Sequence, residues 1–486
     1  MPRFAYRCLA VIVSGLLAGG LLTGCGGGSP ARSGPWRPVT CWFHNGTNLR
    51  IDCGYLTVPL HHDRPGGRSI ELAVEVIHTP NPHPQPDPVV VLAGGPGGAL
   101  VGTGNSALTG YAPIRLLTGW QADRELILLD QRGVGQSRPA LDCAPIGDLA
   151  SGLACRNQLT GRGIDLSAYT AEEIAADVAD LGPALGYRQV NLFGYSYGSL
   201  LALIVMREHP HGVRSVILVS PLPPQASFLS DLPDNEARAF QALFDGCAHD
   251  PRCAAAYPQL ARDFRTAVAR LDARPRQLTV RINGTDRTWP LDGQGLVSLL
   301  SNGIYLEKMA ILPRAIHRAA TGGNLSDWAQ IVTDGAAATA DLGSSVGMSQ
   351  SVLCADEAPF VNRQRARAID AAHPEQRHVF LEPAWWFDLC ARWPTVPVDP
   401  AAHTPVHSGI PTLIVTGQYD PGTPPAYGRL AAATLTRSYF TEFPGQGHIP
   451  ENPCVLSVEA NFLHQPLQRP DTSCIQRTSP ISWETG

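Results

Sequence analysis

Lysine is almost absent from this chain: Lys308 is the only lysine, and the other basic residues are arginines. Charged residues make up only 16% of the sequence and the formal net charge is −5, which gives no reason to expect a nucleic-acid partner. No Cys-x-x-Cys pair occurs, and no internal repeat is visible. The hydrophobic content of 44% instead indicates a globular protein with an ample core, and the length allows two or three domains.

The first 25 residues have the pattern of an export signal. Arg3 and Arg7 precede an apolar stretch over residues 9–22, which is too short and too rich in glycine to be preferred as a membrane span. Leu22-Thr-Gly-Cys25 resembles a bacterial lipobox, in which the cysteine is lipidated; a plain signal-peptidase site is the alternative. A flexible tether is expected over residues 26–40. The pattern predicts export, either to a lipid anchor on the outer face of the membrane or as a secreted protein.

Ten cysteines remain besides Cys8 in the signal and Cys25. An even number suits an oxidising compartment, and we predict sequential disulfides, although sequence alone leaves the connectivity open. A metal site is the alternative, and we predict no metal and no cofactor. The predicted pairs are Cys41–Cys53, Cys143–Cys155, Cys247–Cys253, Cys354–Cys390 and Cys454–Cys474.

Short apolar runs alternate with helical patterns along much of the chain, which predicts right-handed crossovers and a mostly parallel sheet. Between residues 221 and 410 this alternation stops, and short helical patterns rich in alanine and arginine take over. We interpret this stretch as a helical cap inserted before the last two strands, over the strand ends where ligands bind. The predicted organisation is signal 1–25, tether 26–40, core 41–221, cap 222–409 and core 410–486.

Gly194-Tyr-Ser-Tyr-Gly198 lies between an apolar run and a helical pattern, as a G-x-S-x-G nucleophile elbow does. The sharp turn strains Ser196 and leaves no room for side chains at the two glycines. A second copy, residues 343–347, has no strand before it and no amphipathic helix directly after it. We therefore predict Ser196 as the nucleophile and a loop around Ser345.

A serine nucleophile needs a base, and the base needs an orienting carboxylate. In α/β-hydrolases the chain order is serine, acid, histidine. Asp420 follows a late apolar strand and heads a proline-rich turn, and His448 follows the final strand. These residues are the predicted acid and base, with a turn-capping aspartate as the alternative for Asp420.

The transition state also needs hydrogen-bond donors for its oxyanion. One is expected from the backbone of Tyr197, directly after the nucleophile. The other is expected from the glycine loop that follows the first buried strand, residues 94–98, and because Pro96 has no N–H the donor is Gly95, Gly97 or Gly98. A phosphate cradle is the alternative for this loop, but no Gly-Lys-Ser/Thr follows it.

Five motifs, in this order, resemble exported serine peptidases related to proline iminopeptidase, and most strongly their tripeptidyl aminopeptidase branch: Gly94-Gly-Pro-Gly-Gly98, Asp130-Gln-Arg-Gly-Val-Gly-Gln-Ser137, Gly194-Tyr-Ser-Tyr-Gly198, Asp420-Pro-Gly-Thr-Pro424 and Gly445-Gln-Gly-His448. The resemblance runs from about residue 40 to the end and implies the α/β-hydrolase fold. It implies Asp130 and Arg132 as scaffold, and a free N-terminus on the peptide substrate.

Cys354-Ala-Asp356-Glu357 resembles the family's Cys-x-Asp segment, so Asp356 and Glu357 are candidates to bind the substrate ammonium; a solvated charge pair is the alternative. One departure is Ser220-Pro-Leu-Pro-Pro224, where an Asp-Gly turn is expected, so the pocket wall there is expected to differ.

The predicted function is an exported serine exopeptidase that releases tripeptides or other short N-terminal peptides through an acyl-enzyme. A carboxylesterase or lipase-like hydrolase with the same triad is the first alternative, because the fold does not separate esters from amides. A catalytically silent cell-surface binding protein is the second.

Overall fold

The structure is a computed structural model that describes residues 34–42, 49–101, 123–282, 284–340, 344–374, 384–478 and 481–486. The predicted signal, the lipidation site Cys25 and residues 26–33 of the predicted tether lie outside these ranges. Residues 35–486 form one compact unit. Among the helices in the described ranges, none has the length and apolarity needed to cross a membrane.

A nine-stranded sheet forms the centre of this unit, in the order β1-β2-β3-β5-β4-β6-β7-β10-β11. The pairs β1–β2, β2–β3 and β3–β5 are antiparallel, and the neighbours from β5 to β11 are parallel. The sheet confirms the predicted fold class. Its strands are β1 (Trp36–Val39), β2 (Ile51–Pro59), β3 (Ser69–Ile77), β4 (Val89–Leu92), β5 (Leu126–Leu129), β6 (Val190–Tyr195), β7 (Val213–Val219), β10 (Thr412–Gly417) and β11 (Ser438–Phe443).

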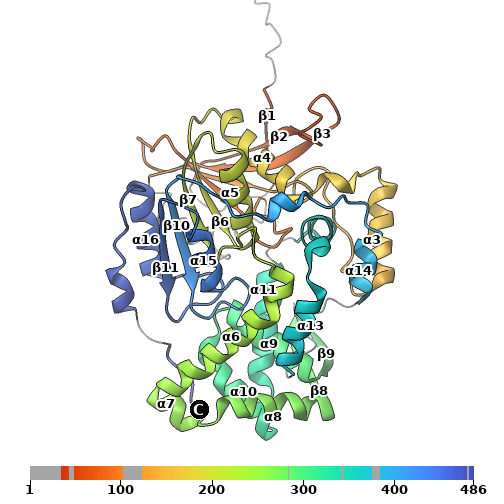
Figure 1. Ribbon diagram of the computed structural model, residues 1–486, viewed down its shortest axis with the longest axis vertical. Coiled ribbons are helices and arrows are strands. Elements are labelled where there is room, and N and C mark those ends of the chain that lie inside the picture. Colours follow the sequence, from red (N-terminus) through yellow and green to blue (C-terminus); the bar gives the residue numbers. More distant parts are fainter. Residues whose placement is uncertain are drawn as a thin grey trace, which may run out of the picture. The chain divides into compact units, whose positions relative to one another are not determined.

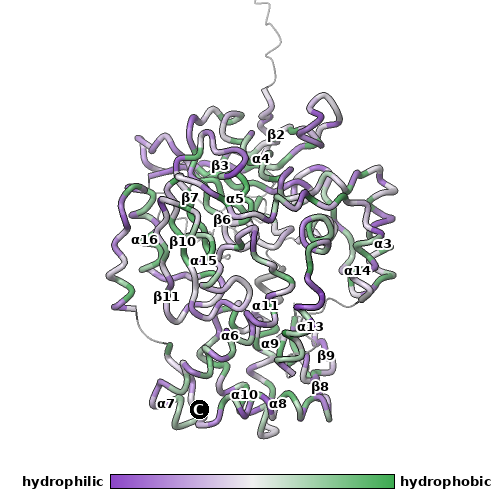
Figure 2. Tube along the Cα trace, viewed as in Figure 1, coloured by the Kyte–Doolittle hydropathy of each residue, from purple (hydrophilic) through white to green (hydrophobic). Residues whose placement is uncertain are grey.

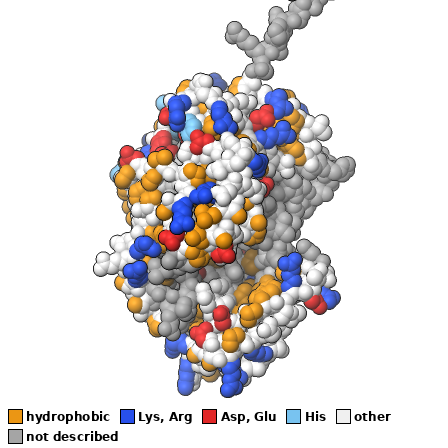
Figure 3. All heavy atoms as spheres, turned by 90° about the vertical axis from the view of Figure 1, so that its right-hand side faces the viewer, with side chains coloured by type: hydrophobic (Ala, Val, Ile, Leu, Met, Phe, Trp, Pro, Cys, Tyr) orange, Lys and Arg blue, Asp and Glu red, His pale blue; other side chains and the backbone are white. Residues whose placement is uncertain are grey.

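Helices cover both faces of the sheet (Figures 1 and 2), and the central strands β4 and β5 are accordingly apolar and buried at every residue. One interior cluster joins the sheet to α4 (Ala171–Ala184) and α5 (Tyr197–Glu208), and another joins the opposite face to α16 (Pro453–His464). On the surface shown in Figure 3, hydrophobic side chains lie in small groups among polar and charged ones. The other helices of the hydrolase core outside the insertion are α3 (Leu149–Gly161), η1 (Leu166–Ala168), α15 (Pro425–Ala432) and η6 (Ser473–Arg477).

The inserted segment has a hydrophobic core of its own, built mainly from residues 239–331, and its helices gather below the strands in Figure 1. This cap contains a two-stranded antiparallel hairpin, β8 (Arg276–Ile282) with β9 (Thr285–Leu291), which the prediction of a helical cap did not include. In β8 Leu278 and Val280 alternate with polar residues and are buried, whereas β9 is mostly exposed and shows no such alternation. The cap helices are α6 (Phe228–His249), α7 (Pro251–Ala256), α8 (Leu260–Ala273), α9 (Gly293–Tyr305), η2 (Met309–Ile311), α10 (Leu312–Thr321) and α11 (Ser326–Ala340).

Much of the remaining insertion returns to the hydrolase core, so the separate cap is shorter than the predicted 222–409, although α13 packs against the cap helix α6. Met348, Val352, Leu389 and Trp393 belong to the same interior cluster as α4 and α5. The elements of this stretch are α12 (Val346–Val352), the π-helix η3 (Leu353–Glu357), η4 (Ala358–Phe360), α13 (Arg363–Ala372), α14 (Ala384–Cys390) and η5 (Pro400–His403).

The predicted tether, residues 26–40, extends too far, because its last residues form a strand. Trp36–Val39 pairs with β2 as an edge strand, and the ring of Trp36 lies where a Cβ on Gly54 would collide with it, at 2.4 Å. Backbone pairing and this close approach hold a segment whose composition alone suggests a flexible chain.

The ten cysteines form five disulfides in the structure, in the same sequential pairs that the sequence suggested. Cys354–Cys390 spans the longest loop, 36 residues, and ties η3 to α14. Cys454–Cys474 ties α16 to η6 near the C-terminus.

Candidate active site

Ser196 stands at the turn between β6 and α5 with φ of 53° and ψ of −126°, a conformation that side-chain-bearing residues rarely adopt. Its backbone N–H donates to Val219 O at 3.0 Å. A Cβ on Gly194 would lie 2.4 Å from Gly198 O, and one on Gly198 would lie 2.0 Å from Leu92 O. The crowding explains both glycines of the motif and fixes the serine above the sheet edge.

Asp420 and His448 come together from the ends of β10 and β11. His448 Nδ1 lies 2.9 Å and 3.0 Å from the two Asp420 carboxylate oxygens. Asp420 is fully buried and also accepts hydrogen bonds from the backbone N–H groups of Gly422 and Thr423, each at 2.9 Å, and from Thr423 Oγ1 at 2.8 Å. A carboxylate placed in this way accepts from Nδ1–H and so orients the imidazole, leaving Nε2 free to take a proton.

A cavity of about 280 Å³ brings the predicted residues to one place. Ser196 and His448 both line it, and most of its other walls are apolar. The full lining is Gly95, Pro96, Ser196, Tyr197, Leu200, Leu222, Phe228, Tyr305, Val352, Leu353, Asp356, Glu357, Thr423 and His448.

The glycine loop and the start of α5 flank the same cavity. Tyr197 is the first residue of α5, and the first N–H groups of a helix have no acceptor within it. Gly95 lines the cavity, whereas Gly98 N–H already lies 3.4 Å from Gly94 O and Gly97 packs against residues 345–349. Among the three predicted glycines, Gly95 is therefore placed best to donate to an oxyanion with Tyr197.

Asp356 and Glu357 line the cavity too, as the last residues of η3. Asp356 is 5% exposed; its Oδ2 accepts from Ala171 N at 2.9 Å, and its Oδ1 is buried without a hydrogen-bond partner among the described residues. Burial raises the pKa of each carboxyl to about 8, and the charge of Asp356 adds to the effect on Glu357. No positively charged side chain is among the described groups that shift the pKa values of Asp356 and Glu357.

Tyr305 and Thr423 contact the acid–base pair, and sequence reasoning missed both. The Tyr305 ring meets the His448 ring edge to face, with centroids 4.7 Å apart, and Thr423 Oγ1 lies 3.3 Å from His448 Nδ1. Thr423 sits in the Asp-Pro-Gly-Thr turn and could have been found there. Tyr305 comes from the cap, and no local pattern relates it to His448.

The departure from the family motif at Ser220 has a structural role. Ser220 has φ of 48°, and its hydroxyl donates to the backbone carbonyl of His448. Leu222, two residues later, lines the cavity. Residues 220–222 thus support the histidine and form part of the apolar wall.

Ser345, in the second copy of the pattern, lies in neither a helix nor a strand, as predicted, but Val346 and Gly347 of the same copy already belong to α12; Gly343 lies outside the described residues. Its neighbour Ser344 pairs with Gly98, and its own N–H donates to Gly97 O at 3.0 Å. The Ser345 hydroxyl is buried, and the residue is not part of the cavity lining. Ser344 and Ser345 therefore hold the glycine loop in place through backbone contacts.

Asp130 and Arg132 make the contacts of scaffold residues. Asp130 accepts from the N–H groups of Leu100, Val101 and Gln136, and Arg132 forms paired hydrogen bonds with Asp177 at 2.7 Å. Neither residue lines the cavity.

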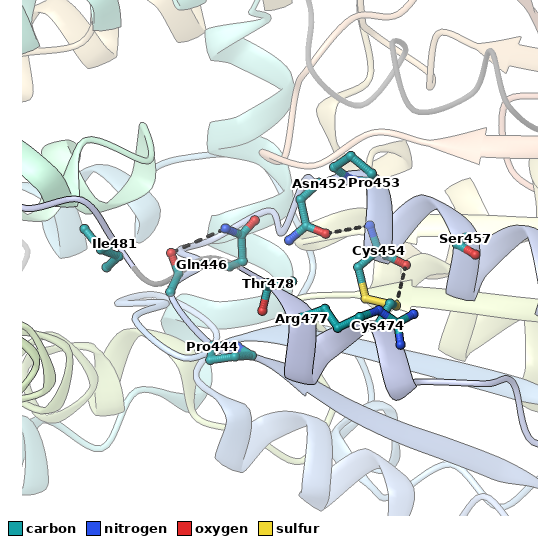
Figure 4. Close-up of a pocket in the computed structure, with 11 residues that line it drawn as sticks. Pro444, Gln446, Asn452, Pro453, Cys454, Ser457, Cys474, Arg477, Thr478 and Ile481 are labelled. Carbon is teal, nitrogen blue, oxygen red and sulfur yellow. Dashed lines mark hydrogen bonds between the residues drawn. A yellow bond between two sulfur atoms is a disulfide. The ribbon is translucent and has the colours of Figure 1, made fainter.

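A larger open cavity, about 570 Å³, lies beside the loop before His448 but contains none of the predicted catalytic residues (Figure 4). The start of α16 and η6 form its walls, with Arg477 and the Cys454–Cys474 disulfide. The candidate catalytic residues Ser196 and His448 belong to the smaller cavity.

One group of side chains among the described residues has ligand atoms close enough for a metal ion: His61, Asp63 and Glu173. It lies outside the cavity, and Arg132 Nη1 is 3.3 Å from Glu173, which opposes a cation there. His403 and His407 have the His-x-x-x-His spacing that metal ligands on a helix can show, but η5 ends at His403 and the two residues do not share a helix.

Comparison with known proteins matches residues 87–450 to the family described as the alpha/beta hydrolase fold. Serine protease Hip1 of Mycobacterium tuberculosis is 27% identical over 439 residues, covering 82% of this chain and 81% of that protein. The tripeptidyl aminopeptidase of Streptomyces coelicolor is 25% identical over 417 residues, covering 77% and 73%. A crystal structure of proline iminopeptidase from Mycobacterium smegmatis aligns with a TM-score of 0.40 and 19% identity, over 85% of this chain and 98% of that one.

Proposed function

The chain belongs to the α/β-hydrolase family, and we propose that it is an exported serine aminopeptidase that releases short peptides from free N-termini. The observation that carries this proposal is that Asp356 and Glu357 share one cavity with Ser196 and His448. The named relatives support it, because they include a serine protease and a tripeptidyl aminopeptidase.

In the proposed reaction Ser196 Oγ attacks the scissile carbonyl and its proton passes to His448 Nε2. Asp420 holds the ring and stabilises the imidazolium, while the N–H groups of Tyr197 and Gly95 bind the oxyanion. His448 then gives the proton to the leaving amine as the C–N bond breaks. Water, deprotonated by His448, hydrolyses the acyl-enzyme and restores the serine.

An α-ammonium group is the cation that the two carboxylates would take. A bound ammonium group would stabilise the ionised form of the two buried carboxyls, and it would donate a hydrogen bond to Asp356 Oδ1. An ester substrate without an amine has no positive charge to pair with these carboxylates. The distance from this pair to Ser196 would then set how many residues are released, with tripeptides expected.

N-terminal acetylation of the substrate tests this proposal. We expect Ala-Ala-Pro-anilide to be cleaved and its N-acetyl form to lose about 100-fold or more in kcat/KM, since acetylation removes the charge and leaves buried carboxylates unpaired. Steady-state rates on both substrates measure this. Equal rates, or rapid turnover of p-nitrophenyl esters without peptide cleavage, would favour a carboxylesterase; no turnover of any substrate would favour a silent binding protein.

The pH dependence should follow the same pair. Below pH 8 the carboxyls of the free enzyme are mostly neutral, so kcat/KM for a free-amine substrate should rise as pH increases toward about 8. Above that it should fall, because the substrate α-amino group itself loses its proton near pH 8. The decline should be missing for an ester without an amine, measured over the same range. A flat profile for the free-amine peptide would contradict the role of the pair.

Export and lipid attachment at Cys25 complete the proposal, supported by the signal pattern and by five disulfides, which suit an oxidising compartment. A Cys25→Ala chain should leave the membrane fraction; if it stays membrane-bound, the lipobox interpretation is wrong.

A further inference from the structure

The short cap turn at the end of α9, residues 304–307, contacts the loops of both the acid and the base. Tyr305 places its ring against His448, and its hydroxyl lies 2.0 Å from where a Cβ on Gly422 would be. Two residues on, Glu307 Oε1 accepts a hydrogen bond of 2.7 Å from the N–H of Gly447, which directly precedes His448. One segment of the cap therefore bridges the two loops.

The fit at Gly447 is tight on two sides. A Cβ there would lie 2.4 Å from Ile304 O and 2.9 Å from Glu307 Oε1. From the other side, the carbonyl of Gly447 lies 1.9 Å from where a Cβ on Gly417, at the end of β10, would be. The backbone before His448 is thus enclosed between the cap turn and the strand that leads to Asp420.

Glu307 holds an unusual backbone conformation to make its contact. Its φ is 57°, in the left-handed region, and besides Ser196 and Ser220 it is the only non-glycine residue with positive φ among those described. Ser196 is the candidate nucleophile and Ser220 bonds the carbonyl of His448. Strained residues that persist in a fold gather at functional sites, and all three here serve the same one.

We propose that Glu307 is a positioning residue for the reaction: by accepting from the Gly447 amide it fixes the backbone, and so the ring, of His448 toward Asp420 and Ser196. The placement of the cap is in this way coupled to the assembly of the acid–base pair. The charged neighbours that act on the Glu307 carboxyl are Asp420 and Glu451. The inference rests on the proposed catalytic roles of Ser196, Asp420 and His448 and does not depend on the peptide or ester preference.

Glu307→Asn and Glu307→Gln test the proposal as a pair. Asparagine tolerates the left-handed conformation but is one methylene too short to reach Gly447, whereas glutamine keeps an oxygen acceptor at the right distance. We expect Glu307→Asn to lower kcat about tenfold or more with KM within about twofold, and Glu307→Gln to restore kcat to within about threefold, because misplaced catalytic groups cost rate steeply.

The rate of Ser196 labelling by a fluorophosphonate should fall with kcat in Glu307→Asn, since labelling needs the same activated serine and no peptide binding. Asp286→Asn, an acid on the cap hairpin paired with Arg281, is the matched control and should change neither rate. Unchanged kcat in Glu307→Asn, a loss confined to KM, or a glutamine variant as slow as the asparagine one would overturn the positioning role. If Ser196→Ala keeps full activity, the proposed function itself fails, which separates the two.

Discussion

Ser196→Ala is expected to abolish hydrolysis, lowering kcat by about 10⁴-fold or more, because no other serine and no cysteine is among the described residues that line the cavity. The fold should be retained, since the turn is set by Gly194, Gly198 and the hydrogen bond from the Ser196 N–H to Val219. Anilide turnover and fluorophosphonate labelling measure the loss, and thermal unfolding checks the fold.

Ser345→Ala supplies the matched control for that experiment. Ser345 sits in the same five-residue pattern, but its hydroxyl is buried away from the cavity lining. Its removal should leave kcat within about twofold. Activity that survives in Ser196→Ala and disappears in Ser345→Ala would reverse the assignment of the two motifs.

Asp420→Asn should lower kcat by about 10⁴-fold with little change in structure. The carboxylate accepts from two backbone N–H groups, from Thr423 Oγ1 and from His448 Nδ1. An amide cannot accept all of these, and an amide NH₂ facing His448 would favour the imidazole tautomer with its proton on Nε2, which cannot act as the base.

Asp399→Asn is the control for the turn-capping alternative. Asp399 also accepts from a backbone N–H two residues later, that of Ala401, and no hydrogen bond or ion pair joins its side chain to a histidine in the described part of the chain. It should keep nearly full activity. If Asp420→Asn retains more than about a tenth of wild-type kcat, its role is that of a turn cap and the acid lies elsewhere.

Local patterns were sufficient to predict the hydrolase core. Continuous apolar runs mark β4 and β5 as strands buried on both faces, and the need for glycine at 194 and 198 marks the elbow, so neighbouring residues predict both features. The order of Ser196, Asp420 and His448 followed from the family pattern, and the structure brings Asp420 and His448 within 2.9 Å.

The cap was less predictable because its contacts join residues far apart in the chain. Nothing near Tyr305 or Glu307 in the sequence relates them to His448, more than 140 residues later, and the contact depends on how the cap packs. Leu278 and Val280 alternate with polar residues and could have indicated β8, but its partner β9 is mostly exposed and gives no such signal. Trp36–Val39 has no clear signal because an edge strand is held by pairing rather than by composition.

Product analysis of a longer peptide tests the central claim most directly. The wild-type protein would be incubated with a decapeptide in free and N-acetylated forms, with Ser196→Ala in parallel, and the products followed over time by mass spectrometry. We predict stepwise loss of short peptides, tripeptides first, from the free N-terminus only, and no product from the acetylated peptide or from Ser196→Ala. Internal cleavage, or equal cleavage of the acetylated peptide, would contradict an aminopeptidase.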